Sequence, residues 1–170
     1  MTMQKKMLKI AAAGCAAVLA ALLLAGCGDD ASKKAFSPVP FDKHDRCHLC
    51  GMVLAHYEGP KAQIIIKGAE DTPLMFCSGR DAFTYALQPE NQRRLLAFFI
   101  HDLGRTSWET PADDALVPAA SAMYVYGHGR EGVMGDEPVA FTDKTKAEAF
   151  IQKWGGKLYR YEDIDLKRLN

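Results

Sequence analysis

Residues 73–81 (PLMFCSGRD) decide the fold class of this chain, because a short apolar strand runs directly into a helix start. Residues 73–76 are apolar and precede Ser78, and an acid, Asp81, follows three positions after that serine, as in a capping box. Apolar side chains then recur at helical spacing until Pro89 ends the run: Ala82, Phe83, Ala86 and Leu87. A strand followed by an amphipathic helix predicts an α+β or α/β unit.

A second segment of the same design begins at Pro138. Residues 138–141 (PVAF) repeat the strand pattern, Thr142 or Asp143 can cap a helix, and Gly155 with Gly156 ends it. Short apolar runs bounded by Gly, Pro and Asp predict the other strands: residues 53–56, 62–67, 95–101, 123–126 and 157–161. We predict an α+β fold of two related small β-β-α-β units, residues 41–102 and 120–165, packed as one compact domain.

The N-terminus has the pattern of a secretory signal. Three lysines precede an apolar run, residues 10–25, and small residues then lead to Cys27 in the sequence LAGC. This is the lipobox pattern, in which the cysteine is acylated and becomes the first residue. An uncleaved anchor is the alternative, but the run is shorter than the roughly 20 residues of a spanning helix. We predict a lipoprotein signal peptide over residues 1–26, a lipid-anchored flexible tether over 27–40 and a folded domain over 41–170.

Composition limits the classes of partner. Without the three lysines of the signal segment, 18 basic and 21 acidic side chains remain, a formal charge of −3. No basic block is present, so we expect no nucleic-acid partner. The hydrolase and phosphate-binding motifs GxSxG, HExxH and a glycine-rich phosphate loop are also missing.

Residues 47–52 (CHLCGM) are the most chemically distinctive stretch. A CxxC pair is used in zinc sites, redox dithiols and soft-metal sites. Zinc needs further ligands, and no second CxxC or HxxxH motif follows. A redox dithiol usually opens a helix, which lowers the thiol pKa, whereas Gly51 leads here into an apolar run. Cu(I) prefers thiolate and thioether ligands, which Cys47, Cys50 and Met52 supply.

Three other residues are candidate ligands. Met134 lies in a glycine-flanked loop (GVMG), where it has no obvious core to fill, although it can also pack against a sheet. His128 lies between two glycines, and we expect it to be exposed. Cys77 follows the strand of residues 73–76 and is either a small buried thiol or a third sulfur ligand.

In this order, the lipobox, CHLCGM at 47–52, FCSGRD at 76–81, HD at 101–102 with Trp108, AMYV at 122–125 and VMG at 133–135 resemble the NosL family. The motifs AF at 140–141, AEAF at 147–150 and GGK at 155–157 extend the resemblance over nearly all of the mature chain. The resemblance implies a two-unit α+β fold and a single Cu(I) site. Its candidate ligands are Cys47, Cys50, Met52 and Met134, with His128 and Cys77 in second rank.

The resemblance also implies a function. The chain is expected to be a periplasm-facing copper chaperone and not an enzyme, held by a lipid on Cys27 to an envelope membrane. Its implied partners are apo-nitrous-oxide reductase and an ABC-transporter-type membrane complex in the maturation of that reductase. The alternatives are an envelope thiol-disulfide oxidoreductase that supports copper-centre assembly and a zinc-stabilised interaction module.

Overall fold

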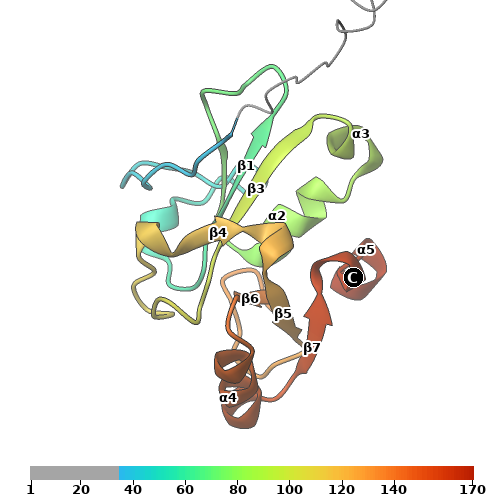
Figure 1. Cartoon of the computed structure of the whole chain (residues 1–170). Helices are drawn as coiled ribbons and strands as arrows, with labels where there is room; N and C mark the ends of the chain where they lie inside the picture. Colours follow the sequence, from blue (N-terminus) through green and yellow to red (C-terminus); the bar gives the residue numbers. More distant parts are fainter. Residues whose placement is uncertain (1–34) are drawn as a thin grey trace, which may run out of the picture. The chain divides into compact units, whose positions relative to one another are not determined.

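The structure, a computed structural model, describes residues 35–170 (Figure 1). The predicted signal peptide, Cys27 and the first part of the predicted tether lie outside this range. Residues Phe36–Asn170 form one compact unit. Within the described part of the chain, every helix is too short or too polar to cross a lipid bilayer.

The first sheet is built from residues 62–118. Helix α2 connects β2 to β3 and packs on β1. The strands are antiparallel in the order β2-β1-β3-β4. Their bounds are β1 (Ala62–Ile66), β2 (Leu74–Phe76), α2 (Gly79–Ala86), α3 (Pro89–Gln92), β3 (Leu95–His101) and β4 (Leu116–Pro118).

The second sheet has three antiparallel strands in the order β6-β5-β7, and α4 connects β6 to β7. Both segments therefore contain two strands, a helix and a further strand in this order, with α3 and β4 added in the first segment, and in both sheets the first strand lies between the second and the third. The bounds are β5 (Met123–Tyr126), β6 (Val139–Phe141), α4 (Lys144–Trp154), β7 (Lys157–Arg160) and a short final helix α5 (Leu166–Leu169). The predicted α+β class is thus confirmed, with two antiparallel sheets.

The helix starts follow from their capping residues. The Ser78 hydroxyl accepts a hydrogen bond from the Asp81 amide at 3.1 Å, which satisfies one free N–H of α2. Asp143, rather than Thr142, caps α4, and its carboxylate accepts from the amides of Thr145 and Lys146. Gly155 has φ +77° and ends α4, because side chains rarely adopt this backbone conformation.

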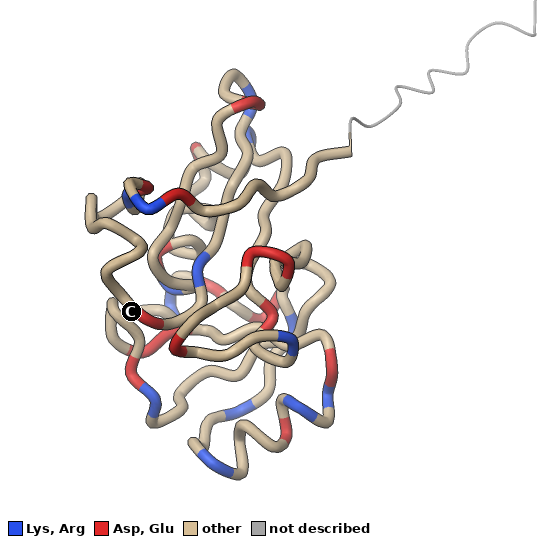
Figure 2. Tube along the Cα trace, turned by 90° about the vertical axis from the view of Figure 1, so that its left-hand side faces the viewer, with Lys and Arg blue, Asp and Glu red and all other residues tan. Residues whose placement is uncertain are grey.

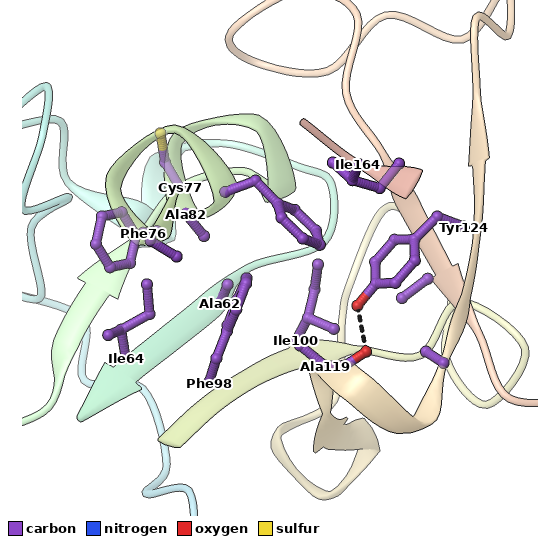
Figure 3. Packing of buried hydrophobic residues seen from close by; sticks show 14 of the residues in the cluster. Ala62, Ile64, Phe76, Cys77, Ala82, Phe98, Ile100, Ala119, Tyr124 and Ile164 are labelled. Carbon is purple, nitrogen blue, oxygen red and sulfur yellow. Dashed lines mark hydrogen bonds between the residues drawn. The ribbon is translucent and has the colours of Figure 1, made fainter. Parts of the chain in front are cut away.

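The main core lies between the first sheet and α2 and continues to the C-terminal segment (Figure 3). Ala62, Ile64 and Ile66 of β1 enter this cluster, whereas Ile65 points to a smaller cluster on the opposite face. Both faces of β1 are buried, which explains why all of its residues except Gln63 are apolar. Tyr124 of β5 is fully buried in the main cluster, so the core joins the two sheets.

Two features of the N-terminal part differ from the prediction. The strand predicted at residues 53–56 is wrong: Val53 makes one isolated bridge to Arg46, and Leu54–His56 is a 3₁₀ turn. Only Leu54 of that turn enters the core. The apolar residues at 53–56 therefore provide one buried side chain and do not form a strand. The packed region also begins before residue 41, because Phe36 packs against the cluster that contains Ile65 and the Val39 amide donates to the Gln63 side chain.

Strand β4 and helices α3 and α5 were not predicted. Each is only three or four residues long, and β4 ends in a proline, so none carries a recognisable periodicity. Along the described trace, basic and acidic residues alternate without a long run of one sign (Figure 2).

Candidate metal centre

A closed loop carries the first two cysteines. The Cys47 amide donates to the Met52 carbonyl at 2.9 Å, and the Gly51 amide donates back to the Cys47 carbonyl at 2.8 Å. Gly51 has φ +76°, a conformation that glycine adopts without strain. The CxxCG spacing therefore forms a tight turn, and neither cysteine lies in a helix.

The turn is attached to strand β2. The His48 amide donates to the Met75 carbonyl at 2.7 Å, one position before the end of β2. Cys77 follows this strand directly, and Asp81 lies in the first turn of α2. The strand end, the helix start and the loop thus meet at one place.

Four side chains are gathered there: Cys47, Cys50, Cys77 and Asp81. Their ligand atoms all lie within 4.8 Å of one another. The Sγ atoms of Cys50 and Cys77 are 3.5 Å apart, and all three thiols are free. We call these four residues the cysteine cluster.

The cluster is open on one side. Cys47 and Cys77 are 2 % and 1 % exposed, whereas Cys50 is exposed. The Asp81 Oδ2 atom lies 3.4 Å from the Cys47 Sγ and 3.6 Å from the Cys77 Sγ. An incoming ion would therefore meet Cys50 first and the two buried thiols next.

The electrostatics favour a thiolate at Cys47. A hydrogen bond from the Cys77 thiol lowers the pKa of Cys47 to about 4, against the opposing effect of burial. The same hydrogen bond raises the pKa of Cys77, with burial acting in the same direction. Burial and the negative charge of Cys47 raise the pKa of Asp81 to about 6. The pKa of Cys47 is thus lowered by a neighbouring thiol, a contact that the CxxC motif alone does not reveal.

This arrangement suits a single metal ion. Thiolates bind metals as anions, and a metal–sulfur distance of about 2.3 Å, as in zinc sites, places two sulfurs on one ion at most about 4.6 Å apart. The cluster is already close to that spacing. Three sulfurs match a soft ion, and the Asp81 oxygen adds a harder fourth donor.

The two predicted thioethers are both half-buried. Met52 is half-buried directly after the Gly51 turn. Met134 is half-buried in the loop between β5 and β6, and it packs against the main core cluster, which contains Cys47 and Cys77. Met134 is thus partly covered and not a freely exposed loop tip.

His128 was expected to be exposed, and this is wrong, because it is 6 % exposed. Its ring lies edge-on to Trp108 and Phe150, and its Nε2 is 2.9 Å from the Glu137 carbonyl oxygen. The flanking glycines allow the chain to turn the ring inward instead of outward. A role for His128 as a copper ligand remains a prediction.

Sequence reasoning missed Asp81 as a candidate ligand and placed Cys77 in second rank. Asp81 was interpreted as the acid of a capping box, yet its carboxylate lies against the two buried thiols. A signal was available: Cys77 and Asp81 are four positions apart across a helix start, and side chains four apart in a helix share a face.

The chain is similar to proteins of known description. The NosL family profile matches residues 38–169. A copper-binding lipoprotein NosL of Stutzerimonas stutzeri is 37 % identical over 158 residues, which cover 92 % of this chain and 82 % of that protein. The NosL of Achromobacter cycloclastes, described in the same words, is 38 % identical over 153 residues, covering 86 % and 77 %.

A solved structure agrees with these relatives. The crystal structure of the copper chaperone NosL from Shewanella denitrificans superposes with a TM-score of 0.76 at 35 % identity. The match covers 78 % of this chain and 98 % of that one. All three descriptions are of binding proteins and not of enzymes. The present chain belongs to the NosL family.

Proposed function

We propose that this protein is a periplasm-facing lipoprotein that binds Cu(I) and delivers it during maturation of nitrous-oxide reductase. One observation carries the proposal: three free thiols from two separate chain segments lie within reach of a single ion, and one of them is exposed. The relatives described as copper-binding proteins support the choice of metal.

The cluster chemistry favours Cu(I) as cargo. Cu(I) is soft and selects thiolate and thioether ligands. Cys47 and Cys77 would hold the ion from the buried side, while exposed Cys50 would be the first ligand exchanged with a partner protein. Met52 and Met134 are proposed as the thioether ligands. Bound copper would also keep the Cys50 and Cys77 sulfurs, 3.5 Å apart, from forming a disulfide in an oxidising compartment.

The proposed location follows from the N-terminal segment. Cys27 would be acylated after removal of residues 1–26, which ties the domain to an envelope membrane. Its proposed partners are apo-nitrous-oxide reductase and an ABC-transporter-type maturation complex. Copper transfer from the loaded protein to apo-reductase, followed by the visible spectrum of the reductase, tests the partner. Mass spectrometry of the membrane-bound protein tests the lipid on Cys27.

Titration with Cu(I) against a competing chromophoric chelator tests the binding function. The mature chain with Cys27→Ser provides a soluble form that retains only the three clustered cysteines. We expect Cys47→Ser, Cys50→Ser and Cys77→Ser each to weaken Cu(I) binding by at least about tenfold, the size seen when even an outer partner of a metal ligand is lost. Met123→Leu, on β5, is the control and should bind normally. Unchanged affinity in all three cysteine variants would refute the proposal.

Two observations keep the alternatives testable. The oxygen of Asp81 completes four ligands, as a zinc-stabilised module requires; such a module would lose its thermal stability when a zinc chelator is added. The lowered pKa of Cys47 suits a thiol-disulfide oxidoreductase, which would turn over a disulfide substrate without any metal. A chaperone predicts neither result.

A further inference from the structure

The loop that carries Met134 is a tight turn. The amides of Gly132 and Gly135 each donate to the other's carbonyl at 3.0 Å, which encloses Val133 and Met134 between them. Gly135 has φ +83°, which closes the turn. The direction of the Met134 side chain therefore depends on how this whole turn is held.

Glu137 attaches the turn to the start of helix α2. It is 1 % exposed, and its Oε2 accepts a hydrogen bond from the Gly79 amide at 2.8 Å. Gly79 is two positions after Cys77. A second bond runs in parallel, from the Arg80 guanidinium to the Asp136 carbonyl at 3.2 Å. The methionine turn is thus anchored on the start of α2, directly after Cys77.

Two glycines leave room for this carboxyl group. A Cβ atom on Gly132 would lie 1.9 Å from the Glu137 Oε1, far inside contact distance. A Cβ atom on Gly79 would lie 2.4 Å from the Pro138 carbonyl oxygen and 3.6 Å from the Glu137 Oε2. Gly132 and Gly79 are far apart in the sequence, yet both make space where Glu137 passes between the turn and the helix.

A buried carboxyl group is costly to retain. The Glu137 carboxyl group lies at the N-terminus of the eight-residue helix α2. The free amides there favour a hydrogen-bond acceptor such as this carboxyl group. A purely apolar contact could fill the same space without this cost, but it would not bond to the helix start. The bond fixes the position and direction of the turn as well as its burial.

We propose that Glu137 is a positioning residue that holds the Val133–Met134 turn against helix α2, so that the Met134 thioether reaches the cysteine cluster. The inference rests on the proposed function, because it assigns Met134 to the Cu(I) site. Glu137 itself does not contact the metal; it acts through Met134. Its removal should cost the site one sulfur ligand while leaving the three thiols in place.

A double-mutant cycle tests this assignment. In the mature chain with Cys27→Ser, we expect Glu137→Ala and Met134→Leu each to weaken Cu(I) binding by about 10- to 100-fold. The combined variant should bind no more weakly than Met134→Leu alone. Glu137→Gln keeps an oxygen acceptor for the Gly79 amide and should restore affinity to within about threefold. X-ray absorption should count one sulfur neighbour fewer in Glu137→Ala and the full number in Glu137→Gln.

Other outcomes overturn the inference. Glu137→Ala that lowers affinity equally in the presence and absence of Met134 shows a general structural role. Glu137→Ala with normal affinity and a full sulfur count removes the role altogether. If Glu137→Ala does not fold, Glu137→Asp, whose carboxyl group is one methylene shorter, enters the same cycle. A wild-type protein that fails to bind Cu(I) refutes the proposed function first, whereas normal wild-type binding with unaffected variants refutes this inference alone.

Discussion

Substitution of His101 by asparagine should remove a large part of the acid sensitivity of this fold. His101 ends β3 and is 1 % exposed, and its Nδ1 accepts a hydrogen bond from the Lys61 amide at 2.9 Å. Burial, with a smaller contribution from the Lys61 charge, lowers the pKa of His101 to about 4 from its ordinary 6.5. In His101→Asn, the side-chain amide oxygen can take the place of Nδ1, so the bond to Lys61 is retained without a titrating group.

The number of protons bound in each state determines how the unfolding free energy changes with pH. Between pH values of about 6.5 and 4, the unfolded chain binds a proton at His101 and the folded protein does not, so the free energy of unfolding falls as the pH drops. The full effect of a shift of this size is about 3 kcal/mol, of which about 2 kcal/mol is lost between pH 7.5 and pH 5. The His101→Asn variant should not show this pH-dependent loss of unfolding free energy. Any packing cost of the substitution is the same at every pH and does not change the slope.

Urea unfolding of the copper-free, reduced protein at several pH values measures the effect. The unfolding free energy of the wild type, relative to that of His101→Asn, should fall by about 2 kcal/mol from pH 7.5 to pH 5. His44→Asn, at an exposed site, is the matched control and should follow the wild-type curve. If the plots of unfolding free energy against pH are parallel for the wild type and His101→Asn, the explanation is wrong. His101 would then bind its proton as readily in the folded protein as in the unfolded chain.

Three further substitutions test other parts of the structure. Tyr124→Phe removes the hydroxyl that donates to the Ala119 carbonyl at 2.6 Å in the core, and should lower the unfolding free energy by about 1–2 kcal/mol in urea. Asp143→Ala removes the cap of α4 and should cost about 1 kcal/mol by the same measurement, whereas equal stability would show that the cap contributes nothing. Asp81→Asn should weaken Zn²⁺ binding by about tenfold and Cu(I) binding by less than about threefold in competition titrations, because the hard oxygen matters more to zinc; equal losses for both metals would contradict the soft-site account.

Local chemistry made the two longer helices, α2 and α4, and most strands predictable. Ser78 and Asp143 mark the starts of α2 and α4. Each side-chain oxygen accepts a hydrogen bond from a free helix amide, and apolar residues at helical spacing follow. Strands β1 and β3 are recognisable from their largely apolar runs. The repeated order of strand, strand, helix and strand follows from these signals.

Other features depend on tertiary contacts and were therefore missed or misassigned. Leu54 is apolar because it anchors a 3₁₀ turn, which a short window cannot distinguish from a strand. The cysteine cluster unites the CxxC loop with the end of β2, and the sequence separation of Cys47 and Cys77 gives no sign of this contact. His128 is buried because of Trp108 and Phe150, both distant in the chain.

X-ray absorption of the Cu(I)-loaded mature chain tests the central claim most directly, because it counts the sulfur neighbours of the metal. We expect a shell dominated by sulfur at about 2.3 Å, which loses one neighbour in Cys77→Ser because this thiol joins the helix start to the CxxC loop. A shell of nitrogen and oxygen, or a sulfur count unchanged by Cys77→Ser, would contradict it.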